Sequence, residues 1–368
     1  MNIGLCGFGV VGRGVYEIVR QRPDMKVKKI LCLEDIQLPD AQTVKDFSEI
    51  LNDPEIDTVV EAMGGLHPSY DFARAALEAG KNVVSSNKAM VCTFYDELVP
   101  LAMHKGVSLR CTAAVGGGIG WLSELERARR VQTINQVGGI MNGTCNYILD
   151  NMTRLGLGYD EALKQAQKLG YAEANPATDV DGIDTWHKVI LSANVAFGIS
   201  LDKTTVPVSG IRNISAADVD CFKAHGKVCK LISTAKRTED GFSAYVQPTL
   251  VDAGSPEGAV PLNYNLITFI GQTSERMSFY GQGAGRYPTA YNVVQDLVDV
   301  TQGKSFYAPY GAPQAADNQE AHHYYVRGDW AGSIQEDWST GVITAPVPVS
   351  QMHQWVKDHP DAFIAAID

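Results

Sequence analysis

"NIGLCGFGVVGRGVYEIV", residues 2–19, opens the chain with a short apolar run, then spaced glycines, then a helical pattern. Residues 3–6 suit a buried strand, and the spacing of the valines that follow suits one face of a helix. The glycines form a GxGxxG between a strand and a helix, the context in which this motif binds a dinucleotide rather than forming an empty tight turn. The predicted cofactor residues here are Gly7, Phe8, Gly9, Val10, Val11 and Gly12.

Apolar runs and helical patterns alternate through the rest of the first third of the chain. Strands are predicted in "MKVKKILCL", "IDTVVEAMGG" and "VSLRCTAAVGGG", and "AALEAGKNVVSSNKAMV" is predicted to be a helix followed by a strand. Such alternation is typical of parallel βαβ units. From about Gly138 the texture changes: "YDEALKQAQKLG" reads as an amphipathic helix, whereas "GFSAYVQPTLV" and "ERMSFYGQG" alternate as strands do. A strand-like "HHYYVRG" and a helical "SQMHQWVKDHPDAFIAAI" follow near the end of the chain.

These patterns predict an α/β protein with two domains. The first is a Rossmann-type parallel-sheet nucleotide-binding domain in residues 1–137, completed by about 286–310. The second is an α+β substrate-binding and dimerisation domain with an open sheet in residues 138–285. Residues 311–368 form a short tail, too short for an independent domain.

The composition excludes several classes of partner. The net charge of −11 provides no basic face for nucleic acid or an anionic membrane. No apolar stretch reaches the ~20 residues that span a bilayer. Seven scattered cysteines without a CxxC pair indicate reduced thiols in a cytoplasmic protein rather than a disulfide framework. We therefore expect a small-molecule partner.

The segment "GYAEANPATDVDGIDTWHK", residues 170–188, combines several carboxylates with one lysine before an apolar helix. Asp184 and Lys188 are four residues apart and therefore share one face of that helix. They could form a plain surface ion pair. The apolar character of the helix instead favours a half-buried pair, and Glu173 lies in a loop that could fold over the same face. Half-buried charges of this kind are candidates for catalysis.

The chain resembles the homoserine dehydrogenase family over roughly residues 1–305. The stretches that carry the resemblance are "GFGVVGRGV", "GKNVVSSNKAMV", "AAVGGGI", "GIMNGTCNYIL", "EALKQAQKLGYAEANPATDVDGIDTWHKVILSANVAFG" and "GQGAGRYPTAYNVVQDL". The resemblance implies hydride transfer between NAD(P)H and aspartate semialdehyde, giving homoserine. It also implies a homodimer, or a dimer of dimers, that associates through the sheet of the second domain.

The resemblance assigns roles to particular residues. Lys188 would be the general acid on the carbonyl oxygen, and Lys88 would be a second active-site lysine. The substrate-binding residues would be Glu173, Asp184, Asp179, Tyr171, Gly170 and Thr144. The cofactor would further contact Glu34, Gly64, Ser85, Ser86 and Gly285. Glu34 and Asp35 place acids near the adenosine ribose, and no arginine is evident beside them, which favours NAD over NADP.

The chain departs from the family at a predicted cation site. Thr112 stands where the family usually has a glutamate that helps to bind a monovalent cation, and Gly120 stands in place of a proline. The other ligands would be the backbone carbonyls of Val115, Gly117 and Ile119. We therefore expect strict dependence on a monovalent cation to be lost. The tail is also too short for a complete ACT regulatory domain.

Three other functions are compatible with parts of the pattern. Cys145 could be a nucleophile in an acylating oxidation, although no histidine lies near it in sequence. A relative acting on a different amino alcohol would retain the same motifs. A non-catalytic dinucleotide sensor would need neither Lys88 nor Lys188, and the presence of both favours an enzyme.

Overall fold

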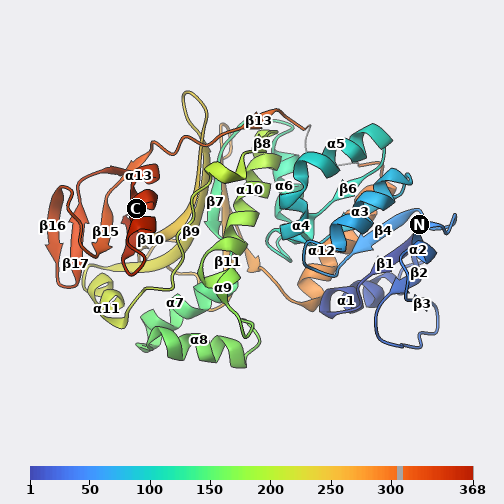
Figure 1. The fold of residues 1–368 in the computed structure, drawn as a ribbon, viewed down its shortest axis with the longest axis horizontal. Helices are drawn as coiled ribbons and strands as arrows, with labels where there is room; N and C mark the ends of the chain where they lie inside the picture. Colours follow the sequence, from blue (N-terminus) through green and yellow to red (C-terminus); the bar gives the residue numbers. More distant parts are fainter. Residues whose placement is uncertain (305–309, 368) are drawn as a thin grey trace. The chain divides into compact units, whose positions relative to one another are not determined.

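The computed structural model describes residues 1–304 and 310–367 and forms two compact units (Figure 1). Unit 1 comprises Met1–Val131, Asn194–Ser200 and Gln282–Ala312, and unit 2 comprises Gln132–Ala193, Leu201–Gly281 and Pro313–Asp368. The first division falls before β7 (Ile134–Ile140), a strand of the second unit, and not after residue 137. In the segment 286–310 expected to complete the first domain, residues 305–309 lie outside the described residues.

Unit 1 contains a six-stranded sheet in the order β3-β2-β1-β4-β5-β6. Its strands are β1 (Asn2–Cys6), β2 (Lys26–Leu31), β3 (Gln42–Val44), β4 (Thr58–Glu61), β5 (Asn82–Ser85) and β6 (Leu109–Arg110). All neighbouring strands pair in parallel. The predicted Rossmann-type sheet is thus confirmed, with the three-residue β3 as an addition. The order reverses between β1 and β4, and ligands bind at such a switch point.

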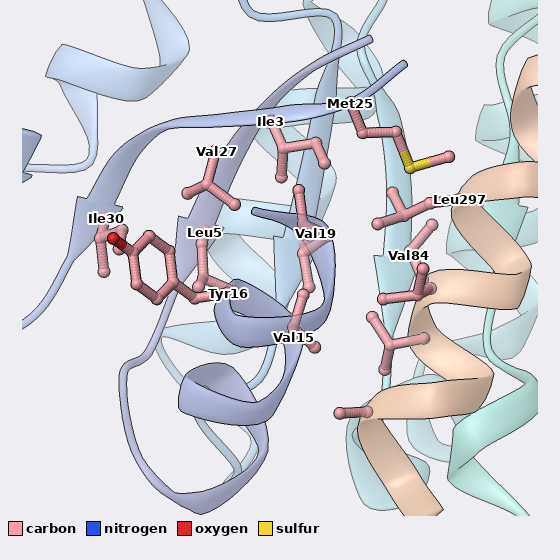
Figure 2. Close-up of a cluster of buried hydrophobic side chains, with 14 of the residues drawn as sticks. Ile3, Leu5, Val15, Tyr16, Val19, Met25, Val27, Ile30, Val84 and Leu297 are labelled. Carbon is pink, nitrogen blue, oxygen red and sulfur yellow. The ribbon is translucent and has the colours of Figure 1, made fainter. Parts of the chain in front are cut away.

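The helices of unit 1 flank this sheet. They are α1 (Val10–Val19), α2 (Ser48–Leu51), α3 (Ser69–Glu78), α4 (Lys88–Thr93), α5 (Tyr95–Lys105), α6 (Trp121–Ala128) and α12 (Arg286–Thr301), with a 3₁₀ turn η1 (Thr112–Ala114). Figure 2 shows apolar side chains of β1, β2 and β5 meeting those of α1 and α12: Ile3, Leu5, Val27, Ile30, Val84, Val15, Val19 and Leu297. This core holds the glycine turn after β1 in place.

Unit 2 is built on a nine-stranded mixed sheet in the order β12-β11-β7-β9-β10-β19-β15-β17-β16. Besides β7, its strands are β9 (Lys227–Arg237), β10 (Phe242–Asp252), β11 (Tyr264–Gly271), β12 (Glu275–Gln282), β15 (Tyr324–Arg327), β16 (Ile334–Trp338), β17 (Gly341–Thr344) and β19 (Phe363–Ile367). The predicted strands β10 and β12 are confirmed. The short strands β8 (Ser200–Leu201) and β13 (Pro313–Gln314) pair with each other, as do β14 (Ala321–His322) and β18 (Val347–Pro348).

Unit 2 also contains helices. They are α7 (Gly143–Leu155), α8 (Tyr159–Lys168), α9 (Ala177–Val180), α10 (Ile183–Phe197), α11 (Ala216–Ala224) and α13 (Val349–Asp358), with a 3₁₀ turn η2 (Lys203–Thr205). The residues of α10 run from unit 2 into unit 1. Within the described ranges, none of the helices has the length and hydropathy that crossing a bilayer requires.

The end of the chain corrects one prediction. The helical pattern expected to run through "DAFIAAI" ends at Asp358, and Phe363–Ile367 form β19 instead. Pro360 lies between them and lacks the N–H that a continuing helix needs. Because β19 pairs in parallel with β10 and antiparallel with β15, the tail extends the sheet of unit 2.

Candidate active site

The glycine turn after β1 has the geometry that a dinucleotide loop requires. Gly7 has φ +96°, and its N–H donates to the carbonyl of Leu31 at 2.9 Å. A Cβ atom on Gly12 would lie 2.1 Å from the carbonyl oxygen of Gly7. Gly9 caps the N-terminus of α1. The turn therefore depends on glycine at these positions, and the free N–H groups of α1 can face a pyrophosphate.

Glu34 lies beyond the end of β2, as expected for a ribose ligand, but its charge is compensated. Arg13, on α1, donates from Nη2 to Oε2 of Glu34 at 3.0 Å, and its guanidinium lies 4.8 Å from the centre of the Phe8 ring. Asp35 pairs with Lys45 at 2.7 Å. The expectation that no arginine accompanies these acids is therefore wrong. Arg13 follows the glycine motif in sequence and reaches Glu34 only because α1 packs beside β2.

Glu61, at the end of β4, is a residue that the sequence analysis missed. Its side chain is fully buried. Oε1 accepts from the backbone N–H of Met63 at 2.9 Å, and Oε2 accepts from the Ser85 hydroxyl at 2.6 Å. The N–H of Gly64 points to the same Oε1 at 3.4 Å. One carboxylate thus contacts two predicted cofactor residues, Gly64 in the loop after β4 and Ser85 at the end of β5. Its place at a parallel strand's carboxyl end was the available signal.

The loop after β5 gathers further predicted residues of unit 1. Asn87 caps α4 by accepting from the N–H of Met90 at 3.1 Å, and its Nδ2 donates to the carbonyl of Gly65 at 2.7 Å. Ser86 precedes Asn87, and Lys88 is the first residue of α4 with a half-buried side chain. Gly285, with φ +128°, caps α12 elsewhere in the same unit.

Lys188 and Asp184 form the predicted pair in unit 2, and both are more deeply buried than expected. Lys188 is 7% exposed and Asp184 5%. The Nζ of Lys188 donates to Oδ2 of Asp184 at 2.7 Å and to the carbonyl of Met141 at 2.6 Å. An ammonium has three N–H donors. Two are directed at these acceptors in the described part of the chain, which leaves one for a ligand.

Asn142 links the carboxylates of Asp179 and Asp184, and the sequence analysis did not predict this residue as part of the site. Its Nδ2 donates to Oδ1 of Asp179 at 2.7 Å and to Oδ2 of Asp184 at 2.8 Å. Its Oδ1 accepts from the N–H of Cys145 at 2.8 Å and thereby caps α7. The structure thus joins Asp179 and Asp184 through the Asn142 amide, and Asp184 in turn pairs with Lys188. An asparagine directly before a helix is a recognisable cap, but its second role depends on the fold.

The loop after α8 carries the remaining predicted residues. The hydroxyl of Thr144 donates to the carbonyl of Tyr171 at 2.5 Å, and the ring of Tyr171 lies 5.2 Å from that of Tyr147. Gly170 adopts φ +76° at the end of α8. Glu173 is exposed, and its carbonyl accepts from Nε2 of Gln167 at 3.0 Å. The loop is therefore anchored to α7, while the carboxylate of Glu173 faces solvent.

Cys145 does not have the environment of a nucleophile. The residue is completely buried, and burial raises the pKa of its thiol well above the ordinary value. Its Sγ lies 3.2 Å from the carbonyl of Asp179. A nucleophilic cysteine needs an accessible thiolate. The geometry therefore favours the lysine at this site over the cysteine.

The predicted cation ligands lie in unit 1, and they do not fit an ion. The carbonyl of Gly117 accepts a hydrogen bond from Nδ2 of Asn292 at 2.5 Å. The hydroxyl of Thr112 donates to Asp296 at 2.6 Å. No group of three or more His, Cys, Asp or Glu side chains suited to a metal occurs among the described residues. Val115 and Ile119 lie in the same turn, Thr112 stands where the resemblance implies a carboxylate, and the carbonyl of Gly117 already faces a donor.

A cavity of about 320 Å³ lies elsewhere in unit 2, on one face of the large sheet. Its lining includes Gln136, Thr234, Lys236 and Ile270, and none of the predicted site residues lines it. The cavity and the buried lysine are therefore separate features.

Comparisons with known proteins decide the family. A family model described as "Homoserine dehydrogenase" matches residues 121–298, and one described as "Homoserine dehydrogenase, NAD binding domain" matches residues 7–112. A homoserine dehydrogenase of Bacillus subtilis (strain 168) is 34% identical over 330 residues, which cover 84% of this chain and 76% of that protein. The chain belongs to the homoserine dehydrogenase family.

Other homoserine dehydrogenases support this membership. The Pseudomonas aeruginosa protein is 36% identical over 314 residues, covering 82% of this chain and 72% of that protein. A crystal structure of a homoserine dehydrogenase from Thiobacillus denitrificans has a TM-score of 0.86 at 27% identity, covering 100% of this chain and 98% of that chain. The protein is therefore an oxidoreductase that acts on a small molecule with a nicotinamide dinucleotide. The resemblance predicted from its motifs is confirmed.

Proposed function

We propose that this homoserine dehydrogenase interconverts L-aspartate 4-semialdehyde and L-homoserine, with Lys188 as the proton donor. The observation that supports the proposal is the buried Lys188–Asp184 pair with one ammonium N–H left for a ligand. The reaction belongs to the branch of amino-acid biosynthesis that supplies threonine and methionine.

The proton-transfer role follows from the charge that develops on the substrate. Reduction of an aldehyde places negative charge on its oxygen, and a buried ammonium stabilises that charge and supplies the proton. Asp184 and the carbonyl of Met141 hold the ammonium in position. The nicotinamide cofactor, when bound, supplies or accepts the hydride. We assign Lys88 as the second lysine of the reaction.

The acidic residues suit the amino group of the substrate. Glu173, Asp179 and Asp184 are the proposed carboxylates, since a substrate with an ammonium group requires negative charge nearby. Asp179 and Asp184 are joined through Asn142. The exposed Glu173 lies in the loop that Thr144 anchors, and Gly170 and Tyr171 line the proposed pocket.

We propose NAD or NADP as the cofactor, with NAD favoured by Glu34. The carboxylate can accept hydrogen bonds from the ribose hydroxyls. The pairing of Arg13 with Glu34 weakens the preference for NAD over NADP. Once the guanidinium of Arg13 is released from Glu34, it can bind the 2′-phosphate of NADP. The remaining cofactor contacts are assigned to the glycine turn, Gly64, Ser85, Ser86 and Gly285.

We also propose a homodimer or a dimer of dimers in the cytoplasm. The face of the sheet that carries Gln136, Lys236 and Ile270 has half-exposed side chains, and these three residues are direct cross-strand neighbours. A second copy could cover this face. The seven free cysteines support a reducing compartment.

Turnover of L-homoserine tests the proposal. Activity with NAD and with NADP is measured on L-homoserine and on a panel of other amino alcohols, for the wild type and for Lys188→Ala. L-homoserine is expected to have the highest kcat/KM, and Lys188→Ala is expected to lower kcat by ~100-fold or more, the typical weight of acid–base catalysis. Lys164→Ala, an exposed lysine on α8, is the control.

Two results would count against the proposal. A higher kcat/KM for another amino alcohol would assign a changed substrate. Full kcat in Lys188→Ala, with cofactor affinity unchanged, would remove Lys188 from the proton-transfer role.

A further inference from the structure

The turn at residues 116–120 links η1 to α6 and contacts the segment that precedes α12. The N–H of Gly118 donates to the carbonyl of Gln282 at 3.1 Å. A Cβ atom on Gly117 would lie 2.5 Å from the carbonyl oxygen of Gly283. Gly283 lies two residues before Gly285, the cap of α12. The shape of the turn therefore positions the segment that leads to Gly285.

A side chain of α12 holds this turn from inside unit 1. Asn292 is 2% exposed, and its Nδ2 donates to the carbonyl of Gly117 at 2.5 Å. Rings of backbone carbonyls bind alkali ions because the oxygens carry partial negative charge. An amide N–H presents partial positive charge to the same oxygen. Asn292 thus supplies part of the attraction that an ion would supply, and its N–H dipole opposes a cation beside that oxygen.

The carboxylate next to Thr112 belongs to a cluster in which Arg110 pairs with Asp296, Glu126 and Asp299, and Lys304 pairs with Asp299. Both the N–H and the hydroxyl of Thr112 donate to Asp296, at 2.7 and 2.6 Å. The Nε of Arg110 donates to the same carboxylate at 3.1 Å. Arg110 and Asp296 are both buried. The buried carboxylate next to Thr112 is therefore paired with a cation that belongs to the chain.

We propose that the amide of Asn292 replaces a monovalent cation in holding the turn at residues 116–120. Asn292 is then a positioning residue for the cofactor segment at Gly285. The stability of unit 1 and its affinity for the reduced cofactor are independent of the alkali ion in the buffer. This inference does not depend on which amino alcohol is the substrate, because both readouts are measured without one.

The wild-type protein provides the first test. The unfolding temperature and the Kd for NADH and for NADPH are measured in potassium, sodium and tetramethylammonium chloride at equal ionic strength. We expect the same values in all three salts. A higher unfolding temperature, or a Kd several-fold lower, in potassium or sodium than in tetramethylammonium would overturn the proposal.

Asn292→Asp provides the second test, because it exchanges the amide for a carboxylate of nearly the same shape. The carboxylate would repel the carbonyl of Gly117 unless a cation came between them. We expect a lower unfolding temperature and a several-fold higher Kd in tetramethylammonium, both restored by potassium or sodium. Gln295→Glu, the same chemical exchange on the exposed side of α12, should show no selective response to these ions.

Each outcome of the second test supports or contradicts the proposed role of Asn292. An Asn292→Asp protein that matches the wild type in every salt, or that is weakened equally in all three, would contradict an exchange between amide and ion. If this variant does not fold in any salt, the wild-type comparison decides. Asn292→Ala then tests the positioning role alone: we expect a several-fold higher Kd for NADH, and a Kd equal to that of the wild type would overturn the proposal.

Discussion

Lys188 shows how a single buried ammonium is accommodated inside unit 2. An isolated ammonium inside a protein is costly, and pairing with hydrogen-bonded acceptors offsets that cost. Asp184 supplies the opposite charge, and the Met141 carbonyl supplies a second acceptor. Asn142 then donates to Asp184, so that the carboxylate is held as well. The position of the Lys188 ammonium is therefore set by hydrogen bonds within the chain.

Arg13 and Glu34 form an ion pair at the surface. Because both side chains are exposed, water screens their attraction and the pair is easily separated. Either partner can be released to a cofactor. We expect Glu34→Gln to raise the Kd for NADH about fivefold, because one hydrogen bond is worth ~1 kcal/mol, and to lower the Kd for NADPH by freeing Arg13. Arg13→Ala should raise the Kd for NADPH and leave that for NADH nearly unchanged.

Fluorescence titration of both reduced cofactors checks this prediction. Arg22→Ala removes another exposed arginine, one that pairs with Asp24 at 2.8 Å, and serves as the control. If Arg13→Ala and Arg22→Ala affect NADPH equally, Arg13 has no part in recognising the 2′-phosphate.

At the scale of elements, strand β9 and helix α7 are joined by the buried Lys230. The Nζ of Lys230 donates to Oδ1 of Asn146 at 2.9 Å and to the carbonyl of Val260 at 2.8 Å. Burial lowers the pKa of Lys230 to about 8, since removal from water disfavours the ammonium. The connection is therefore sensitive to pH.

The unfolding free energy should reflect this lowered pKa. Between pH 8 and the ordinary lysine value of 10.5, the unfolded chain binds the proton at Lys230 and the folded chain does not. Stability contributed by this group therefore rises with pH across that window and is lower below it. Relative to Lys230→Met, the wild type should gain up to about 1.4 kcal/mol per pH unit.

Urea unfolding of both proteins at pH 7.5, 8.5 and 9.5 measures the effect. Subtracting the unfolding free energy of Lys230→Met from that of the wild type removes the contribution of the titratable groups that both proteins contain. A difference that does not change with pH would mean that the pKa of Lys230 is not lowered in the folded protein.

At the scale of the whole molecule, the C-terminal residues are part of unit 2 and not an appendage. β19 lies between β10 and β15 in the nine-stranded sheet. Helix α13 is fastened by His353, whose ring nitrogens lie 3.1 Å from the Ser209 hydroxyl and 3.0 Å from Oε1 of Gln247. Burial lowers the pKa of His353 to about 3, so this imidazole stays neutral at physiological pH. The sheet therefore extends from β12 to β16 as one layer.

The proposed association of two copies can be tested on this sheet. Ile270→Glu places a charge beside Gln136 on the half-exposed face, and burying that charge against a second copy would be unfavourable. We expect sedimentation at micromolar concentration to give a dimer or larger for the wild type and a monomer for this variant. Ile334→Glu, on the exposed edge strand β16, should sediment as the wild type does. A monomeric wild type would rule out the proposed assembly.

The sequence by itself determined the features that depend on residues close together in the chain. The glycine turn after β1 could be predicted because strand, glycines and helix follow one another within 18 residues. The Asp184–Lys188 pair could be predicted because helical spacing places residues four apart on one face. The parallel sheet followed from the alternation of apolar strands and helices, and the family followed from the motifs that these elements carry.

Tertiary structure decided the contacts between residues distant in sequence. Asn142 meets Asp184 across 42 positions, Asn292 meets Gly117 across 175, and Arg13 reaches Glu34 across 21. It also decided that residues 363–367 form a strand, because β10 and β15 offer hydrogen-bonding edges on both sides. The physical reason is that a local pattern fixes which way a side chain points along its own element. The partner that it finds depends on which elements pack beside it.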